Sequence, residues 1–147
     1  NMAFNEAYVY DMVLDSLYLV PWKSTLTGNK NEAKLPKKIE VEEREKYFTM
    51  FDESINFMPL SWDPISQQFV RMSYKNIYGE ELDEYGSPKV LKSEVFLTLL
   101  DKNLNIIKET KLENYTKQPP NHFFRDNTIW LYENIDDELG FVRITLN

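Results

Sequence analysis

This 147-residue sequence contains 24 acidic side chains, but no catalytic motif and no cluster with the spacing of metal ligands. His122 is the single histidine, and there is no cysteine. Because a zinc site takes about four N, S or O ligands, neither zinc binding nor thiol chemistry is expected. His122 lies at the start of a predicted strand, beside Phe123, and no sequence motif for a catalytic nucleophile lies near it. A structural or surface role is therefore the favoured interpretation.

Two acidic groups offer oxygen atoms that a cation would accept. Residues 136–138 (Asp-Asp-Glu) precede Gly140, but their spacing does not match an EF-hand loop of about 12 positions. The second group comprises Glu80, Glu81, Asp83 and Glu84. Both groups are typical of solvated turns and loops. We expect no metal site and no cofactor, and we assign no catalytic residue.

Aromatic side chains could instead stack on a sugar or anchor a peptide. The three tryptophans are Trp22, Trp62 and Trp130. Each lies within or at the end of an apolar strand pattern, where core packing is the favoured explanation. Trp22 follows Pro21 at a strand end, so it is expected to be the most exposed of the three. The sequon at residues 114–116 would be used only in a eukaryotic secretory context.

Charge and hydropathy narrow the classes of partner. The net charge is −7, which disfavours nucleic acid and anionic membrane surfaces. The densest basic group is Lys34, Lys37 and Lys38, and acidic residues follow it directly. No apolar run approaches the roughly 20 residues that span a bilayer. Residues 1–3 lack the features of a signal peptide, so any such peptide is expected upstream.

The elements that position these residues are mostly predicted strands. Aromatic residues make up 14% of the sequence, and such residues favour half-buried strands. One stretch, residues 41–55, has a helical period, which predicts an amphipathic helix packed on an apolar surface. Turns headed by aspartate recur at Asp15, Asp63, Asp101 and Asp126. Loops are expected at residues 23–40, 79–88 and 134–140.

The predicted strands fall into three groups. Residues 7–22 supply two strands, a half blade; residues 56–112 supply four, a complete blade; and residues 122–147 supply three, a partial last blade. A β-propeller contains four to eight four-stranded blades. Residues 1–147 are therefore expected to be a mainly β, antiparallel meander forming about two to three blades of one propeller domain. The remaining blades, in the same or a separate chain, are the expected partner.

Four runs of residues also resemble a known family. They are residues 55–63 (INFMPLSWD), 69–74 (FVRMSY), 95–101 (VFLTLLD) and 129–138 (IWLYENIDDE). The sequence resembles the C-terminal part of an uncharacterised family of bacterial β-propeller proteins, a domain of unknown function. Its members are typically exported, often as lipoproteins. The resemblance implies a propeller fold and an extracytoplasmic location, periplasmic or anchored at the outer membrane, and it implies no catalytic or binding residues.

Three functions remain open at this stage. The preferred one is a non-catalytic binding or scaffolding module, with a glycan or a peptide as the ligand considered. The second is a hydrolase or lyase that acts on a glycan or a peptide, with a site assembled from several blades, including the missing ones. It would be recognised by carboxyl groups of raised pKa that converge in a deep pocket. The third is a self-contained β-sandwich that binds an unknown ligand.

Overall fold

The computed structural model describes residues 2–84, 86–135 and 137–146, and it is mainly β with one short helix. The strands are β1 (Glu6–Asp11), β2 (Ser16–Pro21), β3 (Asn56–Asp63), β4 (Gln68–Leu82), β5 (Pro88–Asp101), β6 (Ile106–Lys111), β7 (His122–Arg125), β8 (Thr128–Ile135) and β9 (Glu138–Thr145). A 3₁₀ turn at Val41–Glu43 leads into the helix α1, Arg44–Asp52. The predicted mainly β, antiparallel fold with one helix is confirmed.

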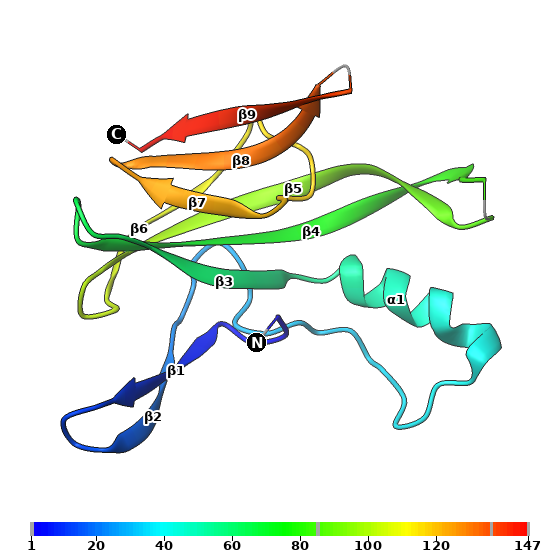
Figure 1. The fold of residues 1–147 in the computed structure, drawn as a ribbon. Helices are drawn as coiled ribbons and strands as arrows, with labels where there is room; N and C mark the ends of the chain where they lie inside the picture. Colours follow the sequence, from blue (N-terminus) through cyan, green and yellow to red (C-terminus); the bar gives the residue numbers. More distant parts are fainter. Residues whose placement is uncertain (1, 85, 136, 147) are drawn as a thin grey trace.

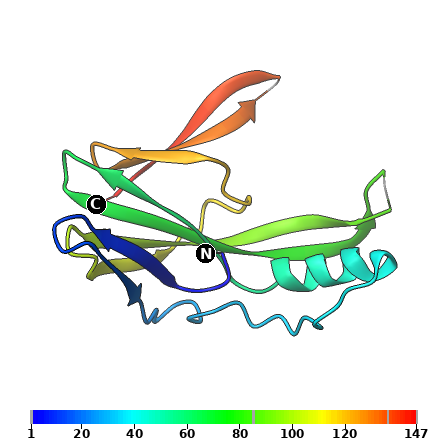
Figure 2. The same cartoon turned by 60° about the horizontal axis from the view of Figure 1, so that its bottom comes forward.

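The strands form three antiparallel meanders of two, four and three strands, in the orders β1-β2, β3-β4-β5-β6 and β7-β8-β9. The β7–β9 sheet lies over one face of the four-stranded sheet, and the β1–β2 hairpin lies on its other side (Figures 1 and 2). None of the three sheets closes on itself within the described residues. The chain is thus a stack of small open sheets.

The main core fills the space between the four-stranded sheet and the β7–β9 sheet. Side chains alternate between the two faces of a strand, so every second residue of β4 and β5 points toward β7 and β8. The buried set is Val70, Met72, Tyr74, Val95, Leu97, Leu99, Phe124, Ile129 and Leu131. These apolar contacts hold the two sheets face to face.

The β4–β5 hairpin is longer than the sequence pattern predicts. Residues 79–82 were expected in a loop but belong to β4, and the ladder runs from the Gln68–Asp101 pair to the Leu82–Pro88 pair with two register shifts. The end of the hairpin is exposed on both faces, so it carries charged side chains such as Glu81, which pairs with Lys89 at 3.6 Å. The backbones of β4 and β5 therefore stay paired at this end, although their residues there do not alternate between polar and apolar.

The β8–β9 turn is likewise shorter than predicted. Residues 134–140 were expected to form a loop, but Asn134 pairs with Leu139 and Glu133 with Gly140 within the ladder. Glu138, expected in a solvated turn at residues 136–138, is instead the first residue of β9 and pairs with Ile135. Asp136 lies outside the described residues.

The helix differs from its prediction in both length and packing. The α-helical part covers nine residues, and none of them is fully buried. Phe48, expected on a packed apolar face, is 69% exposed. Polar contacts fix the C-terminal end instead: the Asn56 amide donates to the carbonyl oxygen of Ser54, and Tyr78 Oη donates to Asp52 Oδ2 at 3.2 Å. Of the predicted apolar face, Phe48 is exposed, whereas Tyr47 and Phe51 are half-buried.

The aspartate-headed turns follow two different mechanisms. Asp63 and Asp101 accept hydrogen bonds from backbone N–H groups two residues on, as an Asx turn requires. Asp15 and Asp126 instead adopt left-handed backbone conformations, with φ of 47° and 51°. In the first hairpin, Asp11 caps the turn. The recurrent aspartates therefore mark turns without marking a uniform repeat.

Candidate functional site

A group of aromatic rings in mutual contact lies on the outer side of the β7–β9 sheet. Ile129 and Leu131 of β8 point into the core, so the alternate residues of β8 and their cross-strand partners point outward. The outward rings are Phe123, Trp130, Tyr132 and Phe141. We call these four residues the aromatic face.

The rings of the aromatic face touch one another. Phe123 and Trp130 stack with centroids 5.9 Å apart and planes 6° apart, and Phe141 meets both edge-on. The guanidinium of Arg143 lies 5.4 Å from the Trp130 ring, a cation–π distance. Phe123, Tyr132 and Phe141 are still 40–43% exposed. An exposed cluster of this kind is typical of a surface that a partner covers.

A shallow hollow of about 300 Å³ opens beside these rings, lined by Phe123 and Trp130 together with Arg125, Asp126 and Thr128. Asp126 and Asn127 both have left-handed backbones, as the two central residues of a tight type I′ hairpin turn do. That turn carries the polar side of the hollow. Where no further sheet covers them, flat rings beside hydrogen-bonding groups suit a sugar ring or a peptide side chain.

The tryptophans do not lie where sequence reasoning placed them. Trp22, expected to be the most exposed, is only 6% exposed, and its indole N–H donates to the Leu104 carbonyl at 2.7 Å. Trp62, expected in the core, is 41% exposed and packs on Phe69 with centroids 4.5 Å apart. Trp130 is half-buried on the aromatic face. Both of the first two predictions were wrong.

Arg71 is a buried cation that sequence reasoning missed. It is 4% exposed, and its guanidinium lies 5.5 Å from the Trp22 ring and 5.1 Å from the Phe57 ring. Burial lowers the pKa of Arg71 to about 10, while Glu6 acts in the opposite direction. The one signal in the sequence is an arginine inside an otherwise apolar strand.

The hydrogen bonds of Arg71 tie the N-terminal arm to the four-stranded sheet. Its Nε donates to the Met58 carbonyl at 2.8 Å, and its terminal nitrogens donate to the Phe4 carbonyl and to Asn5 Oδ1 at 3.3 and 3.2 Å. These partners are internal acceptors of the fold. Arg71 is therefore a structural residue.

His122 lies at the start of β7, as predicted, and it is half-buried. Burial lowers the pKa of His122, while the Pro120 carbonyl, 3.2 Å from Nδ1, acts to raise it. Its Nε2 is buried without a hydrogen-bond partner among the described residues. Burial also raises the pKa of Tyr115, in the sequon, to about 12, with Glu133 adding to the effect. These are uncharged groups at physiological pH.

The carboxyl groups whose pKa is displaced are all displaced downward. Burial would raise the pKa of Asp63, but hydrogen bonds from Ile65, Asn127 and Ser66 outweigh it and lower the pKa. Hydrogen bonds from Lys111 and Lys75 lower the pKa of Glu94 to about 2. A carboxyl group held ionised in this way accepts hydrogen bonds and is a poor proton donor.

The described members of the two acidic groups singled out in the sequence are exposed, except for the half-buried Asp83. Within residues 2–84, 86–135 and 137–146, no group of three or more His, Asp or Glu side chains is placed to hold a metal ion. Glu80 and Glu81 lie on the exposed end of β4, and Asp83 accepts a hydrogen bond from the Ser87 N–H. Asp137 and Glu138 are exposed.

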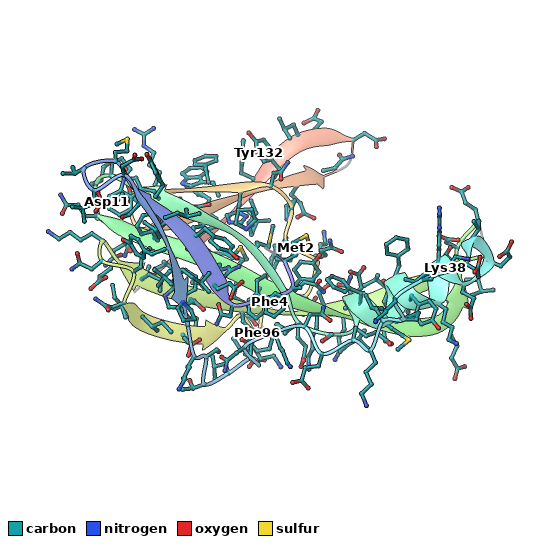
Figure 3. The ribbon with its side chains drawn as sticks, turned by 90° about the horizontal axis from the view of Figure 1, so that it is seen from below. Met2, Phe4, Asp11, Lys38, Phe96 and Tyr132 are labelled. Atoms are coloured by element: carbon teal, nitrogen blue, oxygen red, sulfur yellow. The ribbon has the colours of Figure 1, made fainter. Side chains whose placement is uncertain are left out.

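The basic group lies far from the aromatic face, in the segment beside α1, as Lys38 and Tyr132 show in Figure 3. Lys37 borders an open groove of about 580 Å³ between this segment and the helix, where Phe48 and Phe51 supply apolar lining. Lys38 pairs with Glu40 at 2.7 Å in full solvent. In the described part of the chain, no helix has the length and apolar content needed to cross a bilayer.

Comparison with known proteins gives a family and a fold. The family described as a domain of unknown function (DUF4221) matches residues 1–111. A crystal structure of a DUF4221 member from Bacteroides vulgatus ATCC 8482 superposes with a TM-score of 0.61 at 15% identity. The match covers 99% of this chain and 41% of that one. At this identity the likeness shows the fold alone. No curated protein matches the chain.

Proposed function

The chain belongs to the DUF4221 family of domains of unknown function, and from that premise we propose that it is a segment of a β-propeller. The segment serves binding or scaffolding without catalysis, outside the cytoplasm. Its partners are the further blades of the same ring, and its ligand is a glycan or a peptide.

The aromatic face is the observation that supports this proposal. A propeller blade has two apolar faces, because each blade packs between two others. One face of the β7–β9 sheet packs on β4 and β5, and the other presents Trp130 and its neighbouring rings to solvent. An isolated sandwich would leave that second face polar. A further sheet packed on the rings would bury them.

The arrangement of the strands agrees with blades in a ring. Each of the two larger sheets is an up-and-down meander, and their first strands, β3 and β7, lie in contact. The turns at these strands are joined, because Asp63 Oδ2 accepts a hydrogen bond from the Asn127 N–H at 3.2 Å. In a propeller the first strands of neighbouring blades meet near the central channel, where ligands commonly bind.

The architecture is tested on the native gene product by its intact mass and by oxidative footprinting of aromatic side chains. We expect a polypeptide more than twice this length, in which Trp130 and Phe141 are oxidised several-fold more slowly than in the 1–147 chain. A methionine-containing reporter peptide added to both samples serves as the reference for equal oxidant dose. A complete, stable and monomeric chain of 17.5 kDa would instead identify a small β-sandwich.

Function and location are tested on the same product. Binding to glycan and peptide arrays, with no cleaved fragments released from the bound ligands, is the expected result for a binding module. Release of fragments would establish the hydrolase or lyase alternative. The location rests on the sequence resemblance, and cell fractionation tests it: recovery in the cytoplasmic fraction would contradict an exported module.

A further inference from the structure

The outer edge of β9 offers backbone hydrogen-bonding groups to a further strand. Within the described residues, β9 pairs only with β8, along the whole of its length and without a register shift. The Leu146 N–H, one residue past β9, donates to the Asn127 carbonyl at 2.9 Å on the β8 side. Because N–H directions alternate along a strand, the N–H groups of Leu139, Phe141, Arg143 and Thr145 point away from β8.

The neighbouring sheet shows which position is empty. That sheet has four strands in the order β3-β4-β5-β6, and the β7–β9 sheet has three. Contact between β3 and β7 aligns the first strands of the two sheets. By this alignment β8 corresponds to β4 and β9 to β5, so the position without a strand is the one beside β9 that corresponds to β6.

A groove lies at the end of this empty position, beside the last residues of β9. It has a volume of about 340 Å³ and lies between the core-facing side of β5 and β6 and the end of β9. A strand added beside β9 would direct every second side chain over β6, as Val142 and Ile144 of β9 do over the existing core. The apolar part of its lining consists of Leu97, Leu99, Leu112, Ile144 and Leu146.

We propose that β9 accepts a fourth strand, an extended segment with apolar residues at alternate positions, which pairs antiparallel to β9 and fills this groove. The inference deepens the proposed function and rests on it for the source of the strand: another part of a propeller polypeptide, not a second copy of this chain. The DUF4221 crystal structure contains more chain than the 41% matched here, so chain beyond the matched part is present in that family member. The mode of binding is strand addition at a sheet edge.

The test supplies the strand covalently. Residues 1–147 are extended by a short Gly-Ser linker and an eight-residue strand of alternating Val and Thr. Amide exchange of β9 is then followed by NMR. We expect the outward amides of Phe141, Arg143 and Thr145 to exchange at least about tenfold more slowly than in the unextended chain, and Tm to rise by about 3 °C or more. The inward amides of Val142 and Ile144 report that the sheet is folded in every variant.

Two variants separate strand pairing from other effects. Proline at the two central positions of the appended strand removes its pairing and should return the outward amides to fast exchange. Arg143→Pro in the extended chain should act in the same way by removing an outward N–H, whereas Arg143→Ala should keep the protection. Unchanged exchange of the outward amides in the extended chain, with the inward amides still slow, would overturn the proposal.

A second copy as occupant gives a different pattern. The unextended chain would then be a dimer by light scattering, and the outward β9 amides would already be protected, which would overturn the proposal in favour of self-association. The propeller proposal can be contradicted independently of this one. In that case the native gene product would be a complete chain of 17.5 kDa, and the appended strand would still protect the β9 amides. The two failures are therefore distinguishable.

Discussion

At the scale of single residues, Arg71 links more parts of the chain than its neighbours do. Its guanidinium joins the N-terminal arm at Phe4 and Asn5 to β3 at Met58. Arg71→Ala leaves these three acceptors without their donor. A fully buried acceptor left unpaired costs about 1–3 kcal/mol, and the cost is smaller for the Met58 and Phe4 carbonyls, whose hydrogen bonds are only partly buried. We expect the free energy of unfolding to fall by about 2–4 kcal/mol, measured by urea denaturation.

Two further substitutions test the cause. Arg71→Lys keeps the charge but loses the planar fork of donors, so it should recover little of the stability. Arg125→Ala is the matched control, because the Arg125 side chain is 70% exposed, and its loss should change the free energy of unfolding by less than about 0.5 kcal/mol. Full recovery by lysine would show that charge alone is required.

Glu94 makes a pH-dependent contribution at the same scale. It lies between Lys111 at 2.6 Å and Lys75 at 2.7 Å, whose hydrogen bonds lower its pKa from 4.5 to about 2. A carboxyl group with a lowered pKa in the folded state stabilises the fold above its unfolded pKa. That contribution is lost as the pH falls from about 4.5 to about 2. Partial exposure of the two lysines reduces its size to about 1–2 kcal/mol.

Glu94→Gln should therefore destabilise the protein at pH 7 by about 1–2 kcal/mol and have progressively less effect as the pH falls toward 2. Urea denaturation of both proteins across this range measures the difference. Glu81→Gln is the control, because Glu81 is 84% exposed and lies 3.6 Å from Lys89, so no measurable change is expected. A difference that is constant with pH would exclude the ionised carboxylate as its source.

At the scale of elements, the sequence was most informative where polar and apolar residues alternate. The apolar run at residues 93–100 predicts the buried centre of β5, and the Asp126-Asn127 pair predicts the β7–β8 turn; both are observed. The mainly β class follows from the same signals. Polar and apolar residues alternate in these segments because one face of each strand is buried against a neighbouring sheet.

Other features depend on contacts that no local pattern encodes. The ends of β4 and β5 pair in solvent, so charged residues there are compatible with a strand, although composition favours a loop. Trp22, directly after β2, is buried because it contacts Arg71 and Leu104, which are distant in sequence. The aromatic face was not recognised either, because outward and inward apolar residues look alike until the sheet faces are known.

At the scale of the whole molecule, the three sheets differ in how many buried core residues stabilise them. The four-stranded sheet is packed between two layers and contributes six residues to the main core, whereas β1 and β2 contain no fully buried residue. An isolated two-stranded hairpin is marginally stable in water. Arg71 and Trp22 anchor the base of this hairpin, but its tip has no third strand within the described residues.

Hydrogen exchange of residues 1–147 should reveal this hierarchy. We expect amides in β4 and β5 to exchange only through global unfolding, those of β7–β9 to exchange faster, and those of β1 and β2 to exchange at least about 100-fold faster than β4 through local opening. Arg71→Ala should speed exchange in β1 and β2 further while leaving the order of the other sheets unchanged. Equal protection of all three sheets would mean that the stack unfolds as one cooperative unit, with the hairpin as stable as the core that it covers.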